Sequence, residues 1–126
     1  MWSTGEVMER LRRHRQTCAT LEIVKATLQQ PLHGLSCAQC QRWILEQQQA
    51  ELLKQKVSID AWLLLLPKEE RFLIQTHVID DLDWAKTMAE YENAWGVMNG
   101  RSERTLKRIQ AKAIEQLTTC LNQLGA

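Results

Sequence analysis

The last third of the sequence has the signals of two helices joined by a short break, and this pattern constrains the fold most. Asp83 precedes a stretch of helical character over 84–95, and its carboxylate can cap the first turn of that helix. Gly96 can end the helix, and Asn99-Gly100 is a turn signal. Ser102 is a second capping residue, and the helix after it is expected to run to about Leu124. The pattern therefore predicts a pair of capped helices separated by a turn.

The remainder of the chain also favours helices. Five glycines and two prolines in 126 residues leave few helix breakers. No run of alternating apolar residues indicates a strand. We therefore expect an all-α fold of one domain, or of one domain with a helical extension.

The first half of the chain predicts an antiparallel helical hairpin. Its first helix is expected from Thr4 to about Leu28, ended by Pro31 and Gly34. That helix has residues spaced by four and three, which form an imperfect heptad seam: Val7, Leu11, His14, Cys18, Leu21, Lys25 and Leu28. Ser36 is the expected cap of the second helix, whose apolar residues lie on or near one face: Cys37, Cys40, Trp43, Ile44, Ala50, Leu53 and Val57. The seam would either pair two chains or be buried within one.

The middle of the chain predicts two shorter helices. Ser58 or Asp60 is expected to cap a short apolar helix over 61–66. Pro67 then suits the start of a helix from Lys68 to about Ile79, which the acidic run before Trp84 breaks. These boundaries divide the chain into a hairpin over 1–57 and a helical domain over 58–126.

Charge is distributed unevenly although the chain carries a net charge of only +1. The segment 101–112 has five cations and one anion. The same helix has an apolar stripe that comprises Leu106, Ile109, Ala113, Leu117, Leu121 and Leu124. One face can therefore pack against the bundle while the other binds an anionic partner, which a nucleic-acid binder needs more than a positive total charge.

The helix pair has the outline of a helix-turn-helix, in which the first turns of the second helix meet base edges in the major groove. In this interpretation Ser102 caps the reader helix, and four residues contact DNA: Arg104, Thr105, Lys107 and Arg108. Arg101 and Lys112 would contact flanking phosphates. Four to five phosphate contacts would give a salt dependence with a slope of roughly −4 on a log–log plot. The alternative is an ordinary amphipathic helix with a solvated basic face.

Several motifs together resemble a known family. They are Leu66-Pro67-Lys68-Glu69-Glu70-Arg71-Phe72-Leu73-Ile74, Asp83-Trp84-Ala85, Ser102-Glu103-Arg104-Thr105-Leu106-Lys107-Arg108 and Ala113-Ile114-Glu115-Gln116-Leu117. The run resembles the region 4 helix-turn-helix of sigma-70-type factors. With its helical extension in front, the chain is similar to the ArpU-type phage transcriptional regulators. One departure is that 17 residues separate Trp84 from Ser102, so 92–100 must lengthen the first helix, the turn, or both.

The resemblance implies a sequence-specific, double-stranded-DNA-binding regulator of late or packaging genes of a phage or prophage. Its expected location is the bacterial cytoplasm, and its hairpin would form a homodimer or contact a protein such as RNA polymerase. Two other classes stay open: a small terminase subunit for DNA packaging, and a module that mimics a sigma domain to bind a protein. We expect no enzyme and no cofactor, because no nucleophile motif or phosphate-binding glycine loop is present.

The remaining chemistry-bearing residues favour structural roles. A zinc site would need Cys18, His33, Cys37 and Cys40 together, and a single CxxC motif is weak evidence for one. We expect reduced cysteines in an intracellular protein with no signal peptide and no membrane span, since the longest apolar run covers only 61–66. Core roles are expected for Trp62, Trp84 and Trp95.

Overall fold

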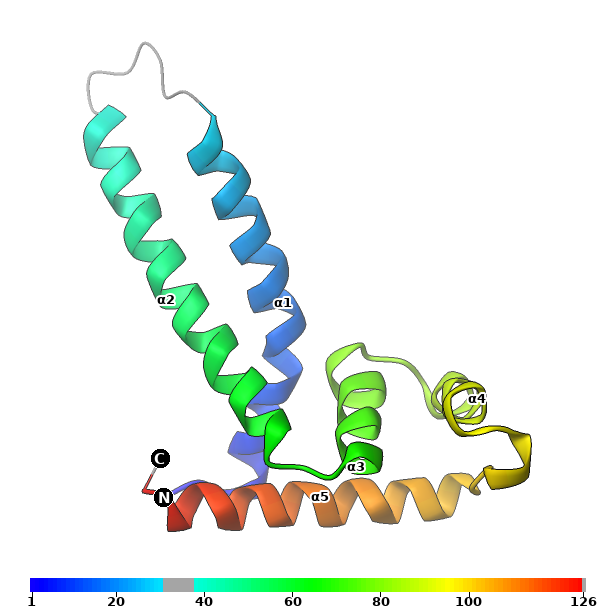
Figure 1. Ribbon diagram of the computed structural model, residues 1–126. Coiled ribbons are helices and arrows are strands. Elements are labelled where there is room, and N and C mark those ends of the chain that lie inside the picture. The colour runs from blue at the N-terminus through cyan, green and yellow to red at the C-terminus, as the bar shows by residue number, and fades with distance from the viewer. Residues whose placement is uncertain (31–37, 126) are drawn as a thin grey trace.

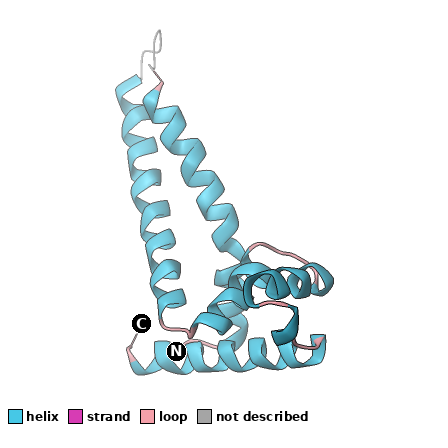
Figure 2. Cartoon of the chain, turned by 45° about the vertical axis from the view of Figure 1, so that its right-hand side comes forward, coloured by secondary structure: helices cyan, strands magenta, loops and turns pink. Residues whose placement is uncertain are grey.

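The computed structural model describes residues 1–30 and 38–125, and within these ranges every regular element is a helix. The expected all-α class is confirmed. The elements in chain order are α1 (Thr4–Gln29), α2 (Ala38–Leu64), α3 (Lys68–Leu73), the π-helical turn η1 (Ile74–Ile79), α4 (Trp84–Trp95), the 3-10 turn η2 (Val97–Asn99) and α5 (Glu103–Gln123). Helices α1 and α2 form a hairpin that rises from α5, and α3 and α4 lie along the same side of α5 (Figure 1). We call the part of the chain from α3 to α5 the base. Figure 2 shows the hairpin and the base from a second direction.

Capping residues define the helix starts. Ser3 accepts a hydrogen bond from the Glu6 backbone N–H (3.1 Å) at the start of α1. The Asp83 carboxylate accepts from the Lys86 N–H (2.8 Å), and the Ser102 hydroxyl accepts from the Thr105 N–H (3.2 Å). Both expected caps of the helix pair are confirmed, and Gly96 ends α4 with a φ of 88° that favours glycine. The expected Ser36 cap lies outside the described residues.

The heptad seam of α1 is buried inside the chain. Val7, Leu11, His14 and Leu21 are buried, and the seam residues between and beyond them are half-buried. Because α2 packs along α1, the seam is used within one chain rather than between two. The sequence left open whether the seam pairs two chains or is buried within one, and the structure shows it buried within one.

Helix α2 corrects the expected start of a helix at Ser58 or Asp60, because it runs unbroken through both. The Ser58 hydroxyl donates to the Lys54 carbonyl (3.0 Å), as serine does inside a helix. The Asp60 carboxylate accepts from Lys56 Nζ (2.7 Å) rather than from a backbone N–H of a new helix. The boundary expected between 57 and 58 therefore falls within a helix.

The apolar face expected for α2 points outward. Trp43, Ile44, Leu53 and Val57 are exposed. The side of α2 that faces α1 instead contains a row of residues spaced by four and three. The row has both polar and apolar members: Leu45, Gln49, Leu52, Lys56, Ile59 and Leu63. At the foot of α2, Ile59, Trp62 and Leu63 are buried, which fixes the rotation of the whole helix and carries Trp43 and Val57 to the opposite side.

Two clusters of buried side chains form the core of the described residues. The larger joins the foot of the hairpin to the base and includes Val7 and Leu11 of α1, Trp62 of α2, and Leu117 and Leu121 of α5. The smaller cluster joins α3, α4 and α5. No helix in the described part of the chain has the length and apolar character needed to cross a bilayer.

Candidate nucleic-acid interface

The smaller core cluster holds α4 against α3 and α5. Its buried members are Leu73, Tyr91 and Leu106. The Trp95 ring stacks on Tyr91 (centroids 4.7 Å apart) and meets Phe72 edge-on (4.8 Å). At the other end of α4, the Trp84 ring stacks on His77 (3.8 Å). Trp84 and Trp95 are thus packed against this cluster, and Trp62 is buried in the larger one, which confirms the expected core roles.

The segment between the two helices accounts for the extra length seen in the sequence. Residues 92–95 form the last turn of α4, and Val97–Asn99 form the 3-10 turn η2. The helix and the turn are therefore both lengthened. In Figure 1, α4 is seen nearly end-on while α5 lies across the view, so the two helices cross steeply.

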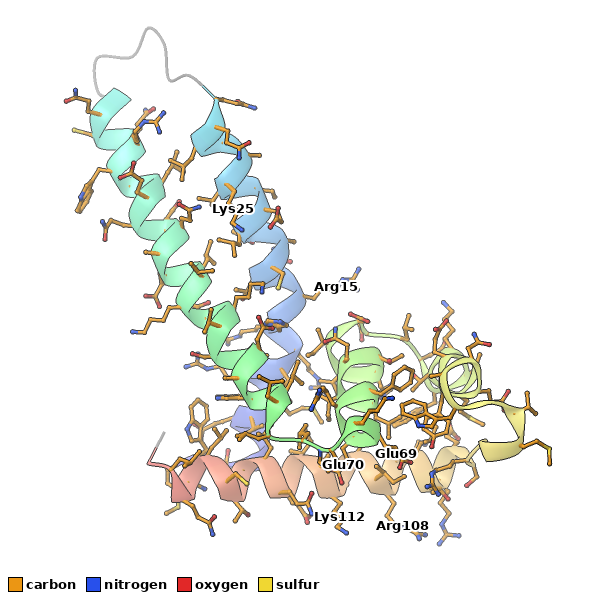
Figure 3. All side chains as sticks on the ribbon, viewed as in Figure 1. Arg15, Lys25, Glu69, Glu70, Arg108 and Lys112 are labelled. Atoms are coloured by element: carbon orange, nitrogen blue, oxygen red, sulfur yellow. The ribbon has the colours of Figure 1, made fainter. Side chains whose placement is uncertain are left out.

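Helix α5 presents one apolar and one basic face. Its buried residues are Leu106, Ala113, Ile114, Leu117, Thr118 and Leu121. Leu124 is exposed, which corrects its expected place in the stripe, because α5 ends at Gln123. On the other face Arg104, Arg108 and Lys112 are exposed, and Figure 3 shows Arg108 and Lys112 pointing away from α3 and the hairpin.

These three cations form one row. They are spaced by four residues, so each lies about 6 Å further along the helix axis than the one before. Among the residues that the structure describes, none forms an ion pair with Arg104, Arg108 or Lys112. The row, which we name the α5 basic row, is therefore open to an external anion.

Arg101 has a different position from the one expected for a phosphate contact. Its Nε donates to the Glu69 carboxylate (2.6 Å) and to the Tyr91 hydroxyl (3.2 Å), and Tyr91 donates to the same Glu69 oxygen (3.0 Å). These hydrogen bonds raise the pKa of Arg101, and burial raises the pKa of Tyr91. The network ties the entry of α5 to α3 and α4. The sequence pattern did not indicate that Glu69 and Tyr91 bind Arg101, since the pairing depends on the tertiary fold.

The other expected contact residues are partly engaged within the chain. Lys107 lies over the Trp84 ring (5.8 Å) and 3.8 Å from the Glu103 carboxylate. The Thr105 hydroxyl hydrogen-bonds to the Ser102 hydroxyl (2.9 Å), which is itself occupied as the cap. Ser102 and Thr105 therefore shape the start of α5, and Lys107 lies beside the α5 basic row.

Arg10, Arg13 and Arg15 of α1 do not extend this row. Arg10 lies over the Trp2 ring (5.5 Å), Arg13 pairs with Glu9 (3.0 Å), and Arg15 donates to the Asp80 carbonyl (3.2 Å). Figure 3 shows Arg15 and Arg108 on opposite sides of the base.

The weak zinc candidates are not brought together as far as the structure describes them. Cys18 lies near Lys56 and Asp60, whereas Cys40 is exposed sixteen positions before Lys56 on α2. That is about 24 Å along the helix. His33 and Cys37 lie outside the described residues. Within the described ranges no group of three or more metal-ligating side chains gathers.

Comparisons of the chain with protein-family models, curated proteins and solved structures gave no match.

Proposed function

We propose that this chain is a sequence-specific transcription regulator of phage or prophage type that reads double-stranded DNA with α5. The α5 basic row is the observation that carries the proposal. Like charges four residues apart destabilise a helix by about 0.2–0.5 kcal/mol per pair. Arg104, Arg108 and Lys112 make two such pairs, and no described carboxylate relieves them. An ordinary solvated face would gain from alternating charges, so the row favours an external polyanion.

The contacts have distinct roles. Arg104 lies in the first turn of α5, where a reader helix meets base edges, and Arg108 lies one turn further. Arginine at such positions can bind guanine in bidentate fashion. Lys112 contacts a phosphate, and Arg101 positions the start of α5 through Glu69 and Tyr91. The steep crossing of α4 and α5 supports the same docking.

A gel-shift titration tests the site. The probe is duplex DNA from upstream of the protein's own gene, with unrelated duplex as competitor. Arg104→Ala combined with Arg108→Ala should weaken specific binding at least about 30-fold, since each base contact contributes about 1–3 kcal/mol. The matched control, Arg12→Ala with Lys25→Ala, removes the same charge from α1 of the hairpin and should bind like wild type. The site assignment is wrong if the double arginine variant keeps wild-type affinity while its circular dichroism is unchanged.

The salt dependence supplies a second measure. With Arg104 and Arg108 on base edges, Lys112 and the partly engaged Lys107 are left for phosphates, so the expected slope is about −2 on the log–log plot. This is shallower than the sequence alone suggested, because Arg101 is bound to Glu69. Absence of any DNA binding at low salt would instead support a protein-interaction module.

A further inference from the structure

Helix α2 exposes an apolar stripe on the side opposite α1. Trp43 is 62% exposed, Val57 56% and Leu64 71%, and Ile44 and Leu53 are about half exposed. Fractions of this size on five large side chains amount to roughly 500 Å² of apolar surface, near the upper end of what a monomeric protein leaves in water. The foot of α2 is already fixed by the buried Trp62 and Leu63, so the helix cannot rotate to hide the stripe.

The stripe has the period of a coiled coil. Trp43, Ala50, Val57 and Leu64 recur every seven residues, and all four are exposed. A second exposed set with the same period completes the spacing of four and three: Cys40, Gln47, Lys54 and Ala61. We name these eight residues the α2 outer seam. A sustained seven-residue repeat favours a partner helix that has the same repeat and supercoils with it to the left.

We propose that the partner on the α2 outer seam is α2 of a second copy of this chain, packed in parallel. A second copy supplies the matching repeat along the full helix, which is about 40 Å long. Gln47 and Lys54 are the polar members of the seam, and isolated polar residues at such positions commonly set the register and limit parallel coiled coils to dimers. Side chains flanking the stripe would bring the buried surface toward the roughly 800 Å² per partner of a stable interface.

The parallel orientation rests on the proposed DNA binding. Arg108 and Lys112 point from α5 away from the hairpin (Figure 3). A two-fold axis parallel to α2 keeps the basic rows of both copies on the same side, where one duplex can reach both. An antiparallel pair would turn the two rows in opposite directions. The parallel dimer therefore predicts a binding site with two related halves.

Analytical ultracentrifugation of the full chain tests the second copy. The wild-type protein should sediment as a dimer at micromolar concentration, and Val57→Lys should sediment as a monomer with unchanged helicity. Val97→Lys is the matched control, because it places the same charge on an exposed valine of η2, outside the seam, and should remain dimeric. A wild-type monomer, or a dimer that Val57→Lys leaves intact, overturns the proposal. A ring of eight or more copies overturns it as well and favours a small terminase subunit.

Disulfide crosslinking tests the orientation. Cys40 is exposed in the first layer of the seam, so parallel pairing places the two Cys40 thiols across the axis from each other. Mild oxidation should give a covalent dimer that Cys40→Ser abolishes. A dimer that never crosslinks through Cys40 overturns the parallel arrangement. Both measurements are made without DNA, so a dimer that binds no DNA contradicts the proposed function alone, and a monomer that binds DNA contradicts this inference alone.

Discussion

His14 is a buried polar side chain on α1, only 6% exposed. Its Nε2 lies 3.3 Å from Asp60 Oδ1 and 3.7 Å from Cys18 Sγ, and its buried Nδ1 has no hydrogen-bond partner among the described residues. Burial lowers the pKa of His14 below 6.5, and the nearby Lys56 adds to this while Asp60 opposes it. The folded chain therefore favours neutral His14.

The lowered pKa predicts that stability falls in mild acid. The unfolded chain binds the proton more readily, so the contribution of neutral His14 is fully present above pH 6.5 and is lost as the pH drops below it. The free energy of unfolding in urea should decrease from pH 7.5 to pH 5.5, and it should decrease less in His14→Leu, which keeps Asp60, Lys56 and Cys18. Equal decreases in both proteins would show that His14 does not carry the effect.

At the scale of single residues, the sequence indicated which cations gather on α5 but not which of them are free. Arg101 and Arg104 look alike in the sequence, yet Arg101 is held by a carboxylate 32 positions earlier and Arg104 is not. Such a pairing depends on where the tertiary fold places Glu69 and Tyr91. A charge pattern along one helix contains no information about it.

At the scale of helices, Ser102 and Ser58 allow one substitution to be tested in two settings. Ser102→Ala removes the side-chain acceptor for the Thr105 N–H and should cost about 1 kcal/mol in urea unfolding, whereas Ser102→Asp should keep the cap. Ser58→Ala changes a mid-helix residue that bonds to the Lys54 carbonyl, so it should be neutral or slightly stabilising. A cost for Ser58→Ala as large as that for Ser102→Ala would mean that α2 is broken at Ser58.

This contrast explains which helices could be predicted. Asp83 follows the acidic break over 80–82, and Ser102 follows the break marked by Gly96 and Asn99-Gly100, so both caps of the helix pair could be predicted from nearby residues. Ser58 has no such break before it, and its capping chemistry is equally satisfied inside a helix. It could not be predicted either that the apolar stripe of α2 faces away from α1, because an apolar stripe indicates burial without indicating which element it packs against. That partner is set by Ile59, Trp62 and Leu63 at the foot.

At the scale of the whole molecule, the hairpin and the base share one core. Val7 and Leu11 of α1 are fully buried against residues of α2 and α5. The two ends of the chain also meet, since the Trp2 N–H donates to the Asn122 side chain (2.6 Å) and Asn122 donates back to the Trp2 carbonyl (3.0 Å). The boundary between 57 and 58 that the sequence suggested therefore falls inside α2. The larger core cluster joins the parts of the chain on both sides of it.

A shared core predicts that damage in α1 destabilises α5. Leu11→Ala should lower the free energy of unfolding by about 2–5 kcal/mol, because it leaves a cavity among buried side chains. Hydrogen exchange should then accelerate in the slowest amides of α5 as much as in those of α1, since both open in the same global unfolding. Ile23→Ala, at an exposed position of α1, should change neither helix by comparison. If Leu11→Ala accelerates exchange in α1 and α2 while the amides of α5 keep their wild-type protection, the base folds without the hairpin and the two are separate units.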